Sequence, residues 1–299
     1  MGAQVAVAAC RFKAGGPATE LYPDEDWPLF ERALVDIGIE PAHVSWDDPD
    51  IDWSSFELVV VRSTWDSVDR PTEYLAWARQ VAAVTNLENA LAAIEWTLDK
   101  HYLADLLSAG VGIVPTEWVA PGQAWDPLSV EYVVKPSISA AGRDTARYQP
   151  GEEPRSRPHV ERLHAAGHTA MIQPYVASVD DRGELKVVFI DGALSHAFRV
   201  GPLLEPGLAA PERPWEKEVW RRTDEPIAPE RSAAEAAAEA VTDRLGRAPL
   251  YCRVDLGSGP ANDQLVMEIE LLDPALGFPA APAGAAHLAA GVARRLSTG

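Results

Sequence analysis

Two acidic residues interrupt an apolar stretch near the carboxyl end of the chain, in LVMEIELLDPALGF at 265–278. The apolar residues predict a buried strand, and Glu268 and Glu270 lie two positions apart in it, so their side chains point to the same face. Carboxylates on one face repel each other, and burying an unpaired charge costs on the order of several kcal/mol. We therefore expect a positive partner on that face.

A third carboxylate belongs to the same face of the predicted sheet. Asp255 follows Arg253 by two positions in YCRVDL, and the turn GSGPAND lets this strand lie beside the strand of Glu268 and Glu270. Three carboxylates from neighbouring strands suit Mg²⁺, with phosphate and water completing its coordination. A structural ion pair between Arg253 and the acids is the alternative. Nothing else in the pattern offsets so many acids. We therefore predict that Glu268→Gln leaves the stability of the metal-free protein unchanged or raises it slightly, because it removes repulsion.

Two lysines stand where the phosphates of a nucleotide could reach them. Lys135 ends the strand YVVKP and precedes SISAAGRD, a loop of small residues whose backbone N–H groups can approach phosphates. Lys100 follows Asp99 near the start of a predicted helix. For either lysine taken alone, the alternative is a solvated surface residue, which is the more common case. Glu184 and Arg199 lie on the two strands of ELKVVFIDGALSHAFRV and are further candidates for the site. The alternative is that a charged residue at the end of an apolar strand only marks a sheet edge.

The first third of the chain must position part of this site, and it alternates strands with helices. Strands are expected at 5–10 and 58–61, and helices at 27–37 and 72–84. This alternation predicts a parallel sheet, in which ligands bind at the carboxyl ends of the strands. Polar residues follow the second strand at that edge, namely Arg62, Ser63 and Asp66. We expect Arg62 to pair with a substrate carboxylate, with a plain surface arginine as the alternative.

The remainder of the chain is rich in strands. Asp191-Gly192 between two apolar runs predicts a two-residue hairpin turn. Helices are expected at 98–109, 232–245 and 287–296, with a Pro-rich loop at 201–229. The change in pattern places a boundary near Trp96, and the fold class expected is α/β, with α+β character in the later domains. The predicted domains are an amino-terminal α/β domain, a central domain and a carboxyl-terminal domain with the metal site, at 1–96, 97–177 and 178–299.

Composition excludes several classes of protein. The chain has 299 residues, 47% of them hydrophobic, and a net charge of −19, which disfavours nucleic acid and anionic membranes as partners. The two cysteines, Cys10 and Cys252, form no disulfide framework, and the start of the chain resembles a first strand more than a signal peptide, so we expect a cytoplasmic protein. Neither a GxxxxGK[ST] phosphate loop nor an HExxH metal motif is present. No feature of the sequence determines the oligomeric state.

The order of these features resembles the ATP-grasp superfamily of carboxylate–amine ligases. A βα domain is followed by Lys100, VVKP with its small-residue loop, IQPYV, ELK with FIDG, FRV, RVD and MEIELLDPALGF. The resemblance covers nearly the whole chain, and VVVRSTWD and LDKHYL place it in the glutathione-synthetase-like branch. Within that branch the chain is most similar to the ligases that close O-ureido-D-serine to D-cycloserine. The fold implied is an open parallel α/β domain followed by two strand-rich domains that clamp the nucleotide.

The resemblance also implies roles for individual residues. Contacts with ATP would come from the lysines, the small-residue loop, an adenine hinge and a ribose-binding carboxylate: Lys100, Lys135, Ser137, Ser139, Gly142, Gln173, Tyr175, Val176 and Glu184. Arg199 and Arg253 would be catalytic, steadying the transferred phosphoryl group. Mg²⁺ would be bound by Asp255, Glu268 and Glu270. The family pattern has Asn where this chain has Glu270, so the number of Mg²⁺ ions, one or two, stays open.

The chemistry implied is activation of the carboxylate of a small amino-acid-like substrate as an acyl phosphate, which a nucleophile then attacks. In a cyclo-ligase that nucleophile belongs to the same molecule, so holding both ends together favours ring closure. Two alternatives remain, a ligase that joins two amino acids into a dipeptide and a nucleotide-binding sensor without chemistry. A sensor predicts loss of Arg199 or Arg253, and both are present.

Overall fold

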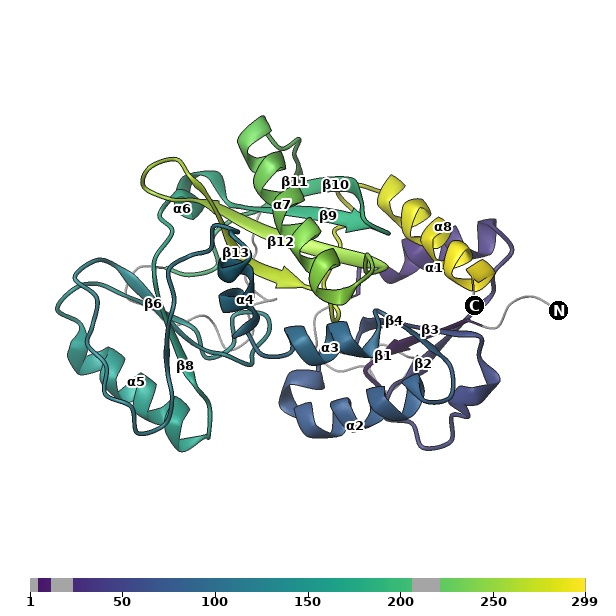
Figure 1. The fold of residues 1–299 in the computed structure, drawn as a ribbon, viewed down its shortest axis with the longest axis horizontal. Coiled ribbons are helices and arrows are strands. Elements are labelled where there is room, and N and C mark those ends of the chain that lie inside the picture. Colours follow the sequence, from purple (N-terminus) through teal and green to yellow (C-terminus); the bar gives the residue numbers. More distant parts are fainter. Residues whose placement is uncertain (1–4, 12–23, 206–220, 299) are drawn as a thin grey trace.

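Three β-sheets organise the chain in the computed structural model, which describes residues 5–11, 24–205 and 221–298 (Figure 1). The first is a parallel sheet in the order β2-β1-β3-β4. Its strands are β1 (Val5–Ala9), β2 (Pro41–Ser45), β3 (Leu58–Ser63) and β4 (Asn86–Glu88). The parallel sheet, β1 and β3 are therefore confirmed, whereas the expectations omitted β2 and β4, which have short or mixed sequences.

Helices cover both faces of this sheet. Successive side chains of its central strands point in opposite directions, so they pack against different helices. Val5 and Val7 pack with side chains of α1 (Trp27–Asp36) and α8 (Ala283–Thr298). Ala6 and Ala8 pack on the other face with side chains of α2 (Pro71–Ala82), such as Tyr74. A strand buried on both faces reads as a continuous apolar run, as VAVAA does. Residues that follow β1 and β3 in the chain, Cys10 and Trp65, line the cavity described below.

The central sheet is antiparallel and has the order β5-β8-β6-β7. Its strands are β5 (Glu117–Val119), β6 (Tyr132–Pro136), β7 (Ala146–Tyr148) and β8 (Ala170–Pro174). Helix α5 (Glu153–Ala165) covers one face through Val160 and Leu163 (Figure 1). The sequence pattern gave no signal for α5, since the segment is strongly polar and carries Pro158 inside the helix.

The third sheet is antiparallel in the order β11-β10-β9-β12-β13. Its strands are β9 (Glu184–Ile190), β10 (Ala193–Val200), β11 (Arg221–Thr223), β12 (Tyr251–Ser258) and β13 (Gln264–Glu270). The predicted hairpin is confirmed, with φ of 52° at Asp191 and 80° at Gly192, as a two-residue turn with positive φ at both positions requires. Helix α7 (Ala228–Leu245) packs on one face. The predicted loop at 201–229 contains β11 and the start of α7, and its residues 206–220 lie outside the described part.

The helix predicted at 98–109 begins only at Tyr102, and the turn that precedes it serves the site. Helix α3 (Leu91–Thr97) ends before it, and α4 (Tyr102–Ser108) begins after it. The Asp99 side chain accepts a hydrogen bond from the backbone N–H of His101, a local bond that competes with helix continuation. The turn also lets the N–H of Lys100 donate to the carbonyl of Ser137, which links the turn to the central domain.

Two helices cross the predicted domain boundaries. The apolar residues of α4 pack with α7 and the third sheet, and those of α8 pack with α1 and the first sheet. Short helices complete the chain, namely α6 (Ser178–Arg182) and the 3₁₀ turns Trp53–Ser55 and Ser67–Asp69. The division at 96 and 177 stays a prediction. No helix among the described residues is long and apolar enough to cross a membrane.

Candidate active site

A cavity of about 620 Å³ is lined by strand residues of the second and third sheets and by loop residues that follow strands of all three sheets. Most of the residues predicted for the site line it, although they come from positions 66 to 270 in the chain. These residues are Asp66, Lys100, Lys135, Ser139, Gly142, Gln173, Tyr175, Val176, Glu184, Arg253, Asp255, Glu268 and Glu270. The tertiary structure therefore brings together what the sequence keeps apart.

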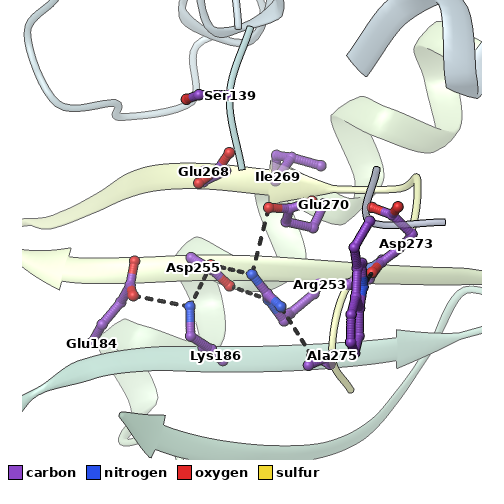
Figure 2. A network of polar contacts seen from close by, with 12 residues as sticks. Ser139, Glu184, Lys186, Arg253, Asp255, Glu268, Ile269, Glu270, Asp273 and Ala275 are labelled. Atoms are coloured by element: carbon purple, nitrogen blue, oxygen red, sulfur yellow. Dashed lines mark hydrogen bonds and ion pairs between the residues drawn. The ribbon is translucent and has the colours of Figure 1, made fainter. Parts of the chain in front are cut away.

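A row of alternating charges crosses the third sheet at the cavity (Figure 2). The strand register places Asp255 beside both Glu268 of β13 and Lys186 of β9. Arg253 bonds Asp255 through two nitrogens, at 2.7 and 2.8 Å, and lies 3.6 Å from Glu270. Lys186 Nζ is 2.6 Å from Asp255 and 2.9 Å from a carboxylate oxygen of Glu184.

These cations correct one expectation from the sequence. Lys186 and Arg253 offset Asp255, and Lys100 lies 3.1 Å from Glu268, so the acids do have partners without metal. Burial acts to raise the pKa of Glu268, but the charges of Lys100 and Lys135 hold it below its ordinary value. Glu270 is different, because burial and the neighbouring Glu268 raise its pKa to about 8. Of the two glutamates, only Glu270 therefore has a raised pKa.

The oxygen donors suit a hard cation in chemistry, but no ligand set is preformed in the part of the chain that the structure describes. No group of three acidic, His or Cys side chains is arranged there to hold a metal. The carboxylates of Asp255 and Glu268 are turned toward lysine and arginine instead. A cation at this position would relieve the charge that raises the pKa of Glu270. The residues therefore fit Mg²⁺ if phosphate oxygens supply the remaining ligands.

The lysines and the small-residue loop form the side of the cavity that suits phosphate. Lys100 Nζ donates to the carbonyl of Ser139 at 2.6 Å, which ties the loop to the turn before α4. Within the described residues Lys135 forms no ion pair, and burial lowers its pKa despite the attraction of Glu268. Gly142 adopts a φ of 71°, a conformation that glycine reaches without strain. A partly buried lysine without an ion-pair partner is suited to bind an anion.

The expected adenine hinge follows β8, and its hydrogen-bonding groups are only partly available. The backbone N–H of Tyr175 donates to the carbonyl of Glu131 at 2.8 Å, so Tyr175 can offer a ligand its carbonyl but not its N–H. In the described part of the molecule the N–H of Val176 has no hydrogen-bond acceptor. Gln173 donates from its side chain to Thr116 at 2.8 Å. The hinge can therefore present one acceptor and one donor, which is the pattern that the edge of an adenine base requires.

Arg62 and Ser63 do not line the cavity, contrary to expectation. Arg62 is 6% exposed, donates to the carbonyl of Pro274 at 2.9 Å and lies 3.5 Å from Asp26. Ser63 Oγ donates to Asp24 at 2.5 Å. Both side chains instead join β3 to neighbouring segments, because the strand continues through residue 63 and stays buried there. Of the three residues predicted on this side, only Asp66 lines the cavity.

Arg199 and Ser137 are also absent from the cavity. Arg199 pairs in register with Leu185, whose side chain packs in the core beneath α7, and so it points away from the face that carries Glu184. Its guanidinium bonds Glu230 at 2.6 Å and also contacts Asp224. Ser137 is buried, and its backbone bonds hold the turn at Lys100. The catalytic role predicted for Arg199 has no support in this geometry.

Several lining residues were not predicted, among them two from the loop after β3 and one from the loop after β13. Trp65 and Asp69 follow β3, and Asp273 follows β13. Arg143 of the small-residue loop contacts the Asp69 carboxylate and donates to the carbonyl of Trp65 at 3.2 Å. A signal was present in the sequence, since Asp273 directly follows the apolar run that contains Glu268 and Glu270, but nothing indicated which way it pointed.

Comparisons with known proteins agree with this fold. A family model for the amino-terminal domain of D-cycloserine synthetase DcsG matches residues 5–89. The cycloserine biosynthesis protein DcsG of Streptomyces lavendulae is 39% identical over 292 residues, covering 93% of this chain and 96% of that protein. The crystal structure of D-cycloserine synthetase DcsG is 34% identical with a TM-score of 0.86, covering 98% of this chain and 99% of that one.

More distant structures share the architecture. D-alanine–D-alanine ligase from Bacillus anthracis has a TM-score of 0.70 at 13% identity, covering 99% of this chain and 98% of that one, which shows the fold alone. The ATP-grasp ligase PsnB, crystallised with its precursor, Mg and ADP, has a TM-score of 0.62 at 17% identity, covering 98% of each chain. The fold and the site thus define an ATP-grasp ligase. Within that class, this chain belongs to the D-cycloserine synthetase family.

Proposed function

We propose that this ligase closes O-ureido-D-serine to D-cycloserine with ATP and Mg²⁺ in the cytoplasm, as one step in the biosynthesis of this antibiotic. The observation that carries the proposal is the similarity over 93% of the chain to a cycloserine biosynthesis protein. The cavity supports it, because phosphate-binding lysines, carboxylates for a divalent cation and a side open to the first sheet meet in one space of about 620 Å³. That volume suits a nucleotide together with a small amino acid.

When bound, ATP supplies the phosphoryl group that turns the substrate carboxylate into a better acyl donor, and Mg²⁺ neutralises phosphate charge. Lys135 of β6 and Lys100 of the turn before α4 would hold the phosphates, beneath the loop of Ser139 and Gly142. The carbonyl of Tyr175 and the N–H of Val176 would orient the adenine, and Glu184 would accept from the ribose hydroxyls. Asp255, Glu268 and Glu270 would ligate Mg²⁺.

Arg253 is the cation best placed to stabilise the reacting carboxyl group. Two bonds to Asp255 and one of 2.9 Å from Nη1 to the carbonyl of Ala275 fix its guanidinium in the cavity. A fixed cation needs no reorganisation as charge develops in the transition state. Lys186 is fixed in the same way by Asp255 and Glu184, which keeps the row of charges rigid.

Ring closure requires water to be kept from the activated carboxyl group. The contact of Arg143 with Asp69 and with the carbonyl of Trp65 holds the small-residue loop against the amino-terminal domain. In that arrangement the ureido nitrogen that is bonded to oxygen attacks the acyl carbon of the same molecule, and phosphate leaves. The ring nitrogen of the product carries no carbamoyl group, so that group must also be lost to water as carbamic acid.

Turnover with purified protein tests the proposal. Phosphate release would be measured with ATP and Mg²⁺ over a panel of O-ureido-D-serine, its L-enantiomer, single D-amino acids and pairs of D-amino acids, with mass spectrometry of the products. D-cycloserine formed only from O-ureido-D-serine is the expected result. Dipeptides from the pairs would establish the alternative ligase, and ATP binding without phosphate release would establish a sensor. If Arg253→Ala is folded but releases no phosphate, the phosphate released by the wild type comes from this site.

A further inference from the structure

One acidic side chain at the cavity differs from the others in its ion pairs. Every other aspartate and glutamate that lines the cavity lies within 4 Å of a lysine or arginine: Asp66, Asp69, Glu184, Asp255, Glu268 and Glu270. Asp273 also lines the cavity, and in the described part of the chain it has no such partner. Since an unpaired carboxylate in a partly buried site is unfavourable, a cationic group of a ligand would stabilise Asp273.

Two hydrogen bonds from the loop after β3 hold Asp273 in place. Thr64 Oγ1 donates to its Oδ2 at 2.8 Å, and Trp65 Nε1 donates to its backbone carbonyl at 2.8 Å. The other carboxylate oxygen, Oδ1, has no protein donor among the described residues. A neutral hydroxyl orients the carboxylate but leaves its charge in place, and burial raises the pKa of Asp273 to about 6 even though Arg62 lowers it. The side chain is thus held in place and partly exposed, and it forms no ion pair with a described lysine or arginine.

Asp273 also has the right neighbours for an amino-acid substrate. It lies three residues beyond Glu270 and two before Ala275, whose carbonyl accepts a bond from Arg253 (Figure 2). The ammonium and carboxylate of an α-amino acid are attached to the same carbon. An ammonium at Asp273 would therefore direct the carboxylate toward the Arg253 side of the cavity, where phosphoryl transfer is proposed.

We propose that Asp273 binds the α-ammonium group of the substrate and so determines specificity for an amino acid over its des-amino analogue. This inference rests on the proposed function and extends it to substrate selection. The ammonium donates to Oδ1 while Thr64 keeps Oδ2, so the acid that has no ion pair among the described lining residues gains a cation, and no existing bond is removed. Loss of a charge-assisted hydrogen bond of this kind weakens binding roughly 10- to 100-fold.

The test compares two ligands on two proteins. Calorimetry would measure the binding of O-ureido-D-serine and of 3-(ureidooxy)propanoate, which lacks the ammonium, to the wild type and to Asp273→Asn in the presence of a non-hydrolysable ATP analogue and Mg²⁺. The wild type should prefer the amino acid by roughly 10-fold or more, and the variant should bind both alike. Steady-state kinetics should show a raised KM for the amino acid and an unchanged KM for ATP. Asp243→Asn, on the exposed side of α7, is the matched control.

The outcomes separate this inference from the proposed function. Equal weakening of both ligands by Asp273→Asn, or a preference retained by the variant, would overturn the role of Asp273 while leaving ring closure intact. A wild type that forms no D-cycloserine but releases phosphate with another amino acid would overturn the proposed substrate, and the ammonium test would then use that amino acid and its des-amino analogue. A wild type that is active with no amino acid would overturn both. Asp273→Glu, which keeps the charge, should recover part of the preference.

Discussion

Arg253 and Asp255 lie two residues apart on β12 and form a two-point ion pair, with Nε 2.7 Å from Oδ1 and Nη2 2.8 Å from Oδ2. Burial acts to raise the pKa of Asp255, but Arg253 and Lys186 hold it below its ordinary value. The proposed metal ligand is therefore ionised and oriented before any metal binds. The consequences differ for the two glutamates on the next strand, because their partners differ.

Glu270→Gln should stabilise the metal-free protein at neutral and higher pH. The folded pKa of about 8 exceeds the ordinary value of 4.5, so the folded state holds this proton more tightly, and stability falls as pH rises from about 4.5 through 8. Glu270→Gln removes this loss. The free energy of unfolding should rise by roughly 1 kcal/mol or more, which raises Tm by roughly 2–4 °C. Melting curves with a chelator between pH 5 and 9 measure it, with the exposed Glu31→Gln as control. Parallel curves for wild type and variant would contradict the assignment.

Glu268→Gln should destabilise the metal-free protein, which reverses the expectation from sequence. Lys100 Nζ lies 3.1 Å from Glu268, and the variant leaves this buried lysine without its charged partner. A folded pKa below 4.5 means that the stabilisation is present above about pH 4.5 and is lost as pH falls. Turnover with Mg²⁺ should be lost as well. Tm with chelator and phosphate release with Mg²⁺ decide the matter, and a variant that is destabilised yet fully active would exclude metal binding by Glu268.

Lys135→Ala should weaken ATP binding strongly and leave the fold intact. Among the described residues Lys135 has no ion pair to lose, and burial already disfavours its charge, so removal costs the apo protein little. Titration calorimetry with ATP should show an affinity lower by roughly 10-fold or more, as expected when a charged contact is lost. Arg32→Ala, on the exposed face of α1, is the control. Unchanged affinity in a folded variant would reject the phosphate-binding role.

Arg62→Ala should reduce stability and leave the KM of folded enzyme for the amino-acid substrate unchanged. The side chain holds the carbonyl of Pro274 and lies over the ring of Tyr251, 5.0 Å from its centre, so its loss uncouples β3 from the loop after β13. Breaking a buried charged contact costs on the order of 3 kcal/mol, a fall in Tm of roughly 5–10 °C. Calorimetric melting and kinetics together test this, beside the exposed Arg79→Ala. A raised KM at unchanged Tm would restore the role predicted from sequence.

Arg199→Ala should likewise act on stability. The variant leaves Glu230, which is 1% exposed, without the nearer of its two arginine partners. Glu230 also accepts a bond from the N–H of Ile227 at the start of α7, so that helix end should loosen. Hydrogen exchange at the first turn of α7 should increase, while kcat of the folded protein stays within about twofold. A loss of kcat comparable to that of Arg253→Ala would make Arg199 catalytic after all.

The sequence by itself determined the class of fold and the chemistry available to the site. Alternating apolar and polar residues, the Asp191-Gly192 turn and the order of motifs are local properties, and the structure confirms the parallel sheet, the hairpin and the ATP-grasp architecture. The same is true of Glu268 and Glu270, because a period of two fixes which side chains share a face. These features depend on neighbours in the chain, which a sequence displays directly.

Only the tertiary structure decided which charged residues meet. Arg62 and Arg199 end apolar strands just as Lys135 does, yet they turn into buried ion pairs while Lys135 faces the cavity. The role proposed for Asp273 depends on its hydrogen bonds with Thr64 and Trp65 in the loop after β3, which the sequence does not reveal. The partners of these two arginines, Asp26 and Glu230, lie 36 and 31 residues away in the chain. Because Coulomb energies depend on distances in space and on burial, no local pattern distinguishes a structural arginine from one that binds substrate.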